Sequence, residues 1–144
     1  MYISEVQKRL MNIITDENRD AVIELAVKNG ANKNELSDAY HIALWFEGAP
    51  KKVKESLLDF YFEDHRYGEV GLRICSHCGK YMTEGYIFGD YSYACDEPCA
   101  IELYREDYRK RTGLNQAPAD ARRDFDYDLE KYPDENFWTD WEQY

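Results

Sequence analysis

Apolar side chains recur at helical spacing through the first 68 residues, in four short runs separated by polar or glycine-containing segments. A surface helix buries residues three and four positions apart, so each run predicts one amphipathic helix. Four short helices joined by short loops predict a compact helical subdomain over residues 1–68. The expected inward-facing positions are Val6, Leu10, Ile13 and Ile14; Val22, Ile23, Leu25 and Ala26; Leu36, Tyr40, Ala43 and Leu44; and Val53, Leu57, Leu58 and Tyr61.

Capping residues set the expected ends of these helices. Ser4 can accept a hydrogen bond from the first turn of one helix, and Asn34 can do the same for the third. The second is expected to start near Thr15 or Asp16, and Pro50 suits the first position of the fourth. Glycine caps predict the ends at Asn29-Gly30, Gly48 and Tyr67-Gly68.

The middle segment has strand patterns followed by a helix. Val70–Ile74 is a short strand candidate. Tyr81–Phe88 and Tyr91–Ala94 are rich in β-forming residues and flank Gly89-Asp90, which predicts a β-hairpin with a two-residue turn. A helix is then expected to run to Gly113, with acidic residues in its first turn and basic residues in its last, as the helix dipole favours.

The C-terminal segment fits two patterns. Acidic and apolar residues alternate over 124–130 as in a strand, yet the apolar residues of 118–132 also fall at helical spacing. We favour the helix, beginning at Pro118 and ending before Pro133. A further short helix is predicted by the spacing of Phe137, Trp138, Trp141 and Tyr144.

These patterns predict an α+β fold in three segments that pack as one compact unit. The segments are a helical subdomain (1–68), a metal module (69–113) and an acidic, aromatic, helical C-terminal segment (114–144). The middle segment differs from its neighbours because it holds all four cysteines of the chain.

The cysteines form two pairs, Cys75-x2-Cys78 and Cys95-x3-Cys99, separated by sixteen residues. A pair two apart folds into a tight turn, called a zinc knuckle, and Gly79 allows the positive φ that such a turn often needs. The second pair opens the predicted helix, whose N-terminus lowers thiol pKa values. The pattern predicts a four-thiolate site for Zn²⁺. Four protein ligands leave no position for water, so the ion is expected to be structural.

Other uses of the cysteines are less consistent with the sequence. Two disulfides are arithmetically possible, but nothing indicates an oxidising compartment. Iron also takes four thiolates, although rubredoxin-like sites usually have two residues between the cysteines of both pairs. His77 could compete as a ligand, but a cysteine pair already fills its turn.

Charge limits the choice of partners. The chain has 29 acidic and 18 basic residues, a net charge of −11, and residues 124–144 hold eight acidic residues against one basic residue. Nucleic acids attract positive surfaces, so the overall balance opposes direct binding to them. The acidity either keeps the protein soluble or complements a partner protein with a basic surface.

The acidic tail is a candidate partner site. If residues 124–130 were extended, their four carboxylates would lie on one face about 6.7 Å apart, comparable to phosphate spacing along a DNA strand. On a helix they form a solvated face instead. Trp138 and Trp141 either anchor a partner or pack on the core of this chain. The four carboxylates belong to Asp124, Asp126, Asp128 and Glu130.

The segment 105–123 carries the main basic cluster and supports a rival hypothesis, contact with DNA or RNA. The alternative is a helix end whose basic residues pair with neighbouring acids, and this is the interpretation we favour. The cluster comprises Arg105, Arg109, Lys110, Arg111, Arg122 and Arg123.

The sequence assembles no catalytic set, so we expect no enzyme activity. Residues 79–94 lack a histidine, while His41 and His65 fall in the helical subdomain. A glycine-rich phosphate loop and a serine–histidine pairing are also missing. No apolar run approaches membrane-spanning length, and the N-terminus lacks a secretory pattern, so a soluble cytosolic protein is expected.

Residues 69–112, with a knuckle, a hairpin and a helix that carries ligands on its first turn, resemble the treble-clef zinc fingers. The thirteen tyrosines and the end Phe137-Trp138-Thr139-Asp140-Trp141-Glu142 are similar to small zinc-binding proteins of phages that infect low-GC Gram-positive bacteria. Type II anti-CRISPR proteins belong to that group. The resemblance implies an inhibitor in the bacterial host cytoplasm that binds an RNA-guided nuclease and blocks loading of its guide or target. The rival is a zinc-dependent phage regulator that binds nucleic acid through 105–123.

Overall fold

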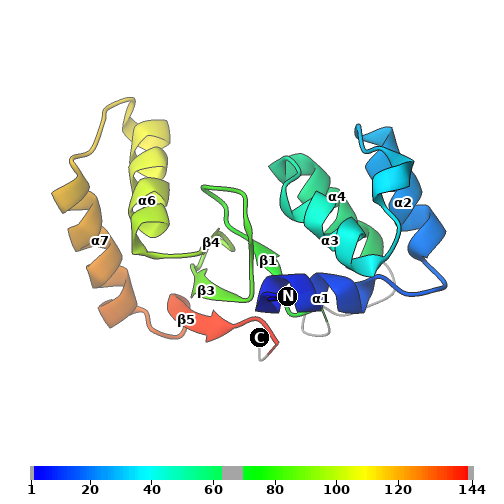
Figure 1. Ribbon diagram of the computed structural model, residues 1–144. Helices are drawn as coiled ribbons and strands as arrows, with labels where there is room; N and C mark the ends of the chain where they lie inside the picture. Colours follow the sequence, from blue (N-terminus) through cyan, green and yellow to red (C-terminus); the bar gives the residue numbers. More distant parts are fainter. Residues whose placement is uncertain (1, 63–69, 143–144) are drawn as a thin grey trace.

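The structure is a computed structural model that describes residues 2–62 and 70–142. Its helices are α1 (Glu5–Ile13), α2 (Arg19–Lys28), α3 (Ala39–Glu47), α4 (Lys51–Phe62), α6 (Glu97–Thr112) and α7 (Pro118–Lys131), with a 3₁₀ turn at Lys33–Glu35. Its strands are β1 (Arg73–Ile74), β2 (Tyr81–Met82), β3 (Glu84–Ile87), β4 (Tyr93–Ala94) and β5 (Phe137–Asp140). This composition confirms the α+β class. Figure 1 shows α1–α4 at one end, α6 and α7 at the other, and the short strands between them.

The first helix begins as the sequence predicts. The Ser4 hydroxyl accepts a hydrogen bond from the Gln7 amide at 3.1 Å, and the Gln7 side chain accepts one from the Ser4 amide at 3.0 Å. This reciprocal pair is a capping box, which satisfies two amides that the helix itself leaves free. Helix α4 begins at Lys51, one residue after the predicted start, so Pro50 immediately precedes the helix and does not occupy its first position.

The second and third helices start later than predicted, and local hydrogen bonds explain both differences. Thr15 and Asn18 bond to each other's backbone, and the Asn18 side chain donates to the Ile13 carbonyl at 2.7 Å, so a turn holds this segment until α2 begins. In α3 the cap is Asp38, whose carboxylate accepts from the His41 amide at 2.9 Å. Asn34, the predicted cap, lies in the 3₁₀ turn.

The α1–α4 lobe has its own hydrophobic core. Leu10, Ile42 and Phe46 are completely buried at its centre. Leu72 and Tyr81, from the segment that follows, pack against the same cluster. This core therefore crosses the predicted boundary at residue 68. The predicted helix end at Tyr67-Gly68 lies outside the described residues.

The strand predicted over Val70–Ile74 is shorter in the structure. Gly71 adopts φ +66°, a left-handed conformation that extended strands do not use, so β1 begins only at Arg73. A Cβ at position 71 would lie 2.7 Å from Cγ of Glu142 and 3.1 Å from a nitrogen of the Arg9 guanidinium. The glycine is required because two other parts of the chain approach its backbone closely.

The strands form two small antiparallel sheets. One pairs β1 with β2, and the other has the order β4-β3-β5. The predicted hairpin is confirmed as β3–β4, but its loop has three residues, Gly89-Asp90-Tyr91, because the amide of Phe88 donates to the Ser92 carbonyl. Tyr91 completes the loop in a left-handed conformation, φ +63°.

The predicted C-terminal aromatic helix is wrong, because residues 137–140 form strand β5. It pairs with β3 in the register Gly85↔Thr139 and Tyr86↔Trp138. Pairing with a strand some fifty residues away in sequence supplies backbone hydrogen bonds that a short isolated helix would lack. By contrast, the helix favoured for 124–130 is confirmed as part of α7.

The second core lies between this sheet and α6 and α7. Its centre consists of Phe125 and Trp141, both essentially inaccessible to solvent, with Ala100 of α6 beside them. Tyr86 and Phe88 of the hairpin make edge-to-face contacts with Phe125, with ring centroids 5.2 and 6.1 Å apart. The metal module and the C-terminal segment thus share one core.

Arg9 of α1 joins the two lobes. Its side chain is only 7% exposed, and its guanidinium makes a two-pronged pair with the Asp140 carboxylate, both N···O distances being 3.2 Å. The same group donates to the carbonyls of Gly71, at 2.6 Å, and Thr83, at 3.3 Å. One buried cation therefore connects the first helix, the start of the metal module and the last strand.

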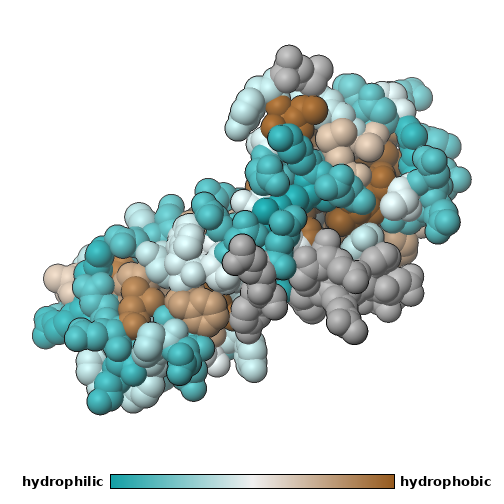
Figure 2. Space-filling model, turned by 90° about the horizontal axis from the view of Figure 1, so that it is seen from below, coloured by the Kyte–Doolittle hydropathy of each residue, from teal (hydrophilic) through white to brown (hydrophobic). Residues whose placement is uncertain are grey.

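Hydrophilic side chains predominate on the face shown in Figure 2, where apolar residues appear as separate patches on the two lobes. Among the described residues, no helix is both long and apolar enough to cross a lipid bilayer.

Candidate metal centre

The four cysteines converge at one place between the two lobes. Their Sγ atoms all lie within 4.8 Å of one another. Cys78 and Cys95 are 3.7 Å apart through sulfur, and Cys95 and Cys99 are 3.6 Å apart. All four are free thiols, so the disulfide alternative is wrong for this structure.

These distances fit a tetrahedral ion. With Zn–S bonds of about 2.3 Å, tetrahedral geometry places the sulfurs about 3.8 Å apart. The separations of 3.6 and 3.7 Å between neighbouring sulfurs agree with this value. A four-cysteine site able to hold a metal ion such as zinc is therefore present, as the spacing predicts.

The first cysteine pair lies in a tight turn between β1 and β2. The Cys75 amide donates to the Lys80 carbonyl, and the Gly79 amide donates to the Cys75 carbonyl, both at 3.0 Å. Gly79 has φ +79°, the positive value predicted for the residue after the second cysteine. Ser76 connects this turn to β4 through bonds of 2.8 and 2.9 Å with Tyr93.

Two lysines of α4 bind the carbonyls of the same turn. Lys54 is 7% exposed, and its ammonium donates to the Gly79 carbonyl at 3.1 Å. Lys51 donates to the Ser76 carbonyl at 3.0 Å. Burial lowers the pKa of Lys54, while the negative charge of Cys78 opposes that change. Four thiolates and one divalent ion carry two net negative charges, so two nearby ammonium groups offset them.

The second pair is positioned by the start of α6. Cys95 precedes the helix, and Asp96 caps it by accepting a hydrogen bond from the Cys99 amide at 2.9 Å. Cys99 lies in the first turn and is 8% exposed. The positive end of the helix dipole is therefore directed at the sulfur cluster, where it favours thiolate.

The surroundings of the thiols shift their pKa values in opposite directions. Burial raises the pKa of the Cys75 thiol, but backbone hydrogen bonds around Cys78, Cys95 and His77 outweigh it and lower that pKa to about 7. Burial raises the pKa of Cys95 to about 12 and also raises that of Cys99, and the charge of Cys75 adds to both effects. Burial therefore outweighs the effect of the helix N-terminus on these two thiols, and a bound cation would be needed to hold all four as thiolates.

His77 takes no part in the cluster. Its Nδ1 lies 2.9 Å from a carboxylate oxygen of Glu106 on α6. This contact connects the cysteine turn to the middle of the helix, in agreement with the prediction that His77 is not a ligand.

The candidate partner residues are not arranged as the extended interpretation requires. On α7 the carboxylates of Asp124 and Asp128 lie one turn apart, and Asp126 and Glu130 lie on another face. The four carboxylates therefore do not form a single row with the spacing of phosphates along a DNA strand. Asp124 accepts from Gln116 at 2.7 Å, Asp126 pairs with Arg122 at 3.3 Å, and Asp128 accepts from Tyr104 at 2.6 Å.

The two tryptophans separate into different environments. Trp141 is fully buried against the ring of Tyr93, so it belongs to the core and presents no surface to a partner. Trp138 is 45% exposed and lies edge to face on Tyr86, with centroids 4.8 Å apart. Of the two, Trp138 alone is accessible.

Sequence reasoning missed the lysines that contact the cysteine turn. A signal was present, because Lys54 falls three, four and seven residues before Leu57, Leu58 and Tyr61, on the inward stripe of its helix. A charged residue within an apolar stripe indicates a buried partner, although the partner, Gly79, cannot be identified locally.

Comparison of the chain with known protein families, curated proteins and solved structures gave no match.

Proposed function

We propose that this chain is a non-enzymatic binding protein that a structural zinc ion holds together. The observation that carries the proposal is the closed set of four cysteines, whose sulfurs all lie within 4.8 Å. Four protein ligands complete the tetrahedron of Zn²⁺, so a bound ion has no position for a substrate or an activated water. The knuckle between β1 and β2, the β3–β4 hairpin and the start of α6 support assignment to the treble-clef class of zinc modules.

Zinc as the natural metal is part of the proposal, and elemental analysis of protein purified without added metal tests it. One zinc per chain is expected. Replacing Cys78 by serine should abolish binding and lower the thermal midpoint, because metal-binding energy is folding energy in a small site. Ser56 to alanine is the control, since it alters a half-buried helix residue whose hydroxyl donates to the Lys52 carbonyl, away from the sulfurs. Iron in place of zinc, or a Cys78→Ser variant as stable as the parent, contradicts the assignment.

The binding role rests on charge. A net charge of −11 favours association with a basic surface and accelerates encounter with it. The basic residues of segment 105–123 do little to offset this negative charge, because most of them already form ion pairs with acidic residues. These pairs are Arg105–Glu102, Arg111–Asp107, Arg122–Glu97 and Arg123–Asp120.

These ion pairs also weaken the rival role of a regulator that contacts DNA or RNA. An arginine already paired with a carboxylate releases fewer counterions when it meets phosphate. A mobility-shift assay with duplex DNA and with single-stranded RNA tests the point, and we expect no complex at 150 mM salt. A complex that disappears in the double variant Arg109→Ala, Lys110→Ala would instead favour the regulator.

The finer proposal is an inhibitor of a type II RNA-guided nuclease. The four-cysteine pattern and the aromatic, acidic end of the sequence suggest it, together with the acidity expected of a ligand for the positively charged nucleic-acid channel of such enzymes. In the test, the protein is added to purified type II nuclease either before or after the guide RNA, and DNA cleavage is measured. Inhibition only when the protein is added first is expected if it blocks loading. Full cleavage and no binding at 150 mM salt contradict this partner.

A further inference from the structure

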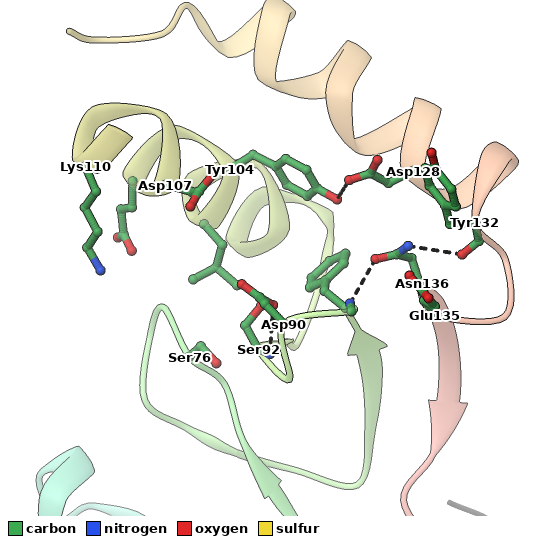
Figure 3. Close-up of a pocket in the computed structure, with 14 residues that line it drawn as sticks. Ser76, Asp90, Ser92, Tyr104, Asp107, Lys110, Asp128, Tyr132, Glu135 and Asn136 are labelled. Carbon is green, nitrogen blue, oxygen red and sulfur yellow. Dashed lines mark hydrogen bonds between the residues drawn. The ribbon is translucent and has the colours of Figure 1, made fainter. Parts of the chain in front are cut away.

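A cavity of about 580 Å³ lies beside α6, next to the hairpin loop and the segment after α7, and it extends to Ser76 of the cysteine turn. The hairpin loop after β3, one side of α6 and the segment following α7 form its walls (Figure 3). Its volume is in the range of ligand sites and suits a large side chain or a short peptide segment. None of its residues is a metal ligand, although Ser76 belongs to the cysteine turn and borders both the cavity and the metal centre.

The lining of the cavity is strongly negative. Five carboxylates border it, against the single ammonium group of Lys110; of these five, Asp107 pairs with Arg111 and Glu106 contacts His77. Within residues 2–62 and 70–142, Asp128 accepts a hydrogen bond from the Tyr104 hydroxyl, and Asp90 accepts from the Ser92 hydroxyl and amide; these donors are neutral and leave the carboxylate charges in place. Among the ion pairs of the described residues, none involves Asp90, Asp128 or Glu135. In Figure 3 these three residues come from the hairpin loop, α7 and the segment after it.

The state of Tyr104 agrees with a negative cavity. Burial raises the pKa of its hydroxyl, and the hydrogen bond to Asp128 and the charges of Asp128 and Asp90 raise it further. Tyr104 therefore stays a neutral donor and keeps Asp128 in place. Its ring packs edge to face on Phe88, with centroids 5.6 Å apart, which gives the cavity an aromatic wall.

The arrangement does not suit a divalent metal ion. Calcium and magnesium ions require several oxygen ligands, each about 2.0–2.6 Å from the ion. In the described part of the chain, the four cysteines are the only group of three or more His, Cys, Asp or Glu side chains that lie close enough together to share a metal ion. Dispersed carboxylates beside aromatic rings instead match a broad, planar, delocalised cation, which can stack on a ring while its N–H groups reach separate acceptors.

We propose that this cavity receives an arginine side chain from a basic surface of the partner protein. The inference rests on the proposed function, because it names the place where the acidic protein contacts its basic partner. Asp128 and Glu135 accept the guanidinium hydrogen bonds, and Phe88 and Tyr132 provide the apolar sides of the site. The sequence-derived candidate Asp128 thus acts in a pocket and not in a row of carboxylates.

The test compares two variants with the same change in net charge. Asp128→Asn with Glu135→Gln removes two charges from the cavity, and the new amide oxygen at 128 still accepts from Tyr104. Asp20→Asn with Glu24→Gln removes two exposed charges from α2, in the other lobe. Both proteins are checked for zinc content and thermal midpoint, which should equal those of the parent.

The probe is an acetylated and amidated hexa-arginine peptide, titrated at 150 mM salt and followed by amide chemical shifts. The cavity variant should bind it at least tenfold more weakly than the parent, whereas the control should change less than twofold. Shifts should concentrate at residues 88–92, 104–110 and 128–136. Equal weakening in both variants, or shifts spread over the whole surface, would overturn the proposal because they indicate non-specific attraction.

A second arm separates this inference from the proposed function. Binding of the parent and both variants to purified type II nuclease is measured under the same conditions. If the nuclease binds the parent and the cavity variant equally well, the cavity assignment is wrong and the binding role stands. If the nuclease does not bind the parent but the peptide still binds at the cavity, the nuclease is the wrong partner and the cavity assignment stands.

Discussion

The contact between Arg9 and Asp140 provides a quantitative test of how the two lobes are joined. We consider the substitutions Arg9→Met and Asp140→Asn, singly and together. Methionine keeps much of the apolar stem of the arginine, and asparagine keeps the shape of the aspartate, so each change removes mainly the charge and its hydrogen bonds. The double-mutant cycle then isolates the interaction between the two groups.

The magnitude follows from burial and geometry. Hydrogen bonds to charged groups contribute about 1.5–3 kcal/mol, and this pair has two of them at 3.2 Å. The Asp140 side chain is 36% exposed, so solvent screening lowers the expected coupling to about 1–2 kcal/mol. Arg9→Met alone should cost about 2–4 kcal/mol, since it also removes the donor for the carbonyls of Gly71 and Thr83.

The assay is urea unfolding of zinc-saturated protein at pH 7. The hydrogen bond from Arg9 is the main cause that lowers the pKa of Asp140. A carboxylate with a lowered folded-state pKa stabilises fully above its unfolded value of about 3.9, and this stability is lost as pH falls through the folded value. At pH 7 the full contribution is therefore measured. A coupling energy below about 0.5 kcal/mol would refute the reasoning, because it would mean that solvent already satisfies both groups.

Three further outcomes are expected. Chelation of zinc should unfold the metal module, which circular dichroism would record as a loss of structure that added zinc restores; an unchanged spectrum would contradict a structural ion. Lys54→Met should weaken zinc binding about tenfold, because it removes the donor to the Gly79 carbonyl and a positive charge beside the thiolates. A competition assay with a chromophoric chelator measures this change. Lys52→Met, on the exposed side of α4, is the control and should leave zinc binding unchanged. Gly85→Ala should destabilise by about 2 kcal/mol or more in urea unfolding, since its Cβ would lie 2.5 Å from the Ala94 carbonyl oxygen; parental stability would show that β4 moves freely.

The metal centre was predictable because its information is local. The spacing of Cys75, Cys78, Cys95 and Cys99, with Gly79 after the first pair, specifies a tight turn and a helix start that bring the sulfurs together. The same holds for helix α1, whose start depends on contacts between Ser4 and a residue three positions later.

Features that depend on distant contacts were not predictable in this way. The aromatic spacing at 137–141 fits a helix as well as it fits a strand followed by a buried Trp141, and the choice is made by β3. Likewise, the strand predicted from Val70 begins only at Arg73, because Gly71 is left-handed where Arg9 and Glu142 approach its backbone. In each case tertiary packing overrides a local preference.

The position of β5 in the sequence affects how the protein emerges from the ribosome. Fifty residues separate the end of β3, Ile87, from the start of β5, Phe137. At about 5–20 residues per second, the nascent chain spends roughly 3–10 s with one edge of β3 unpaired and the Arg9 guanidinium without its carboxylate. An open strand edge is a site for incorrect pairing with other chains. Early zinc capture by the cysteines, all translated before β5, would keep that edge in a folded module during the delay.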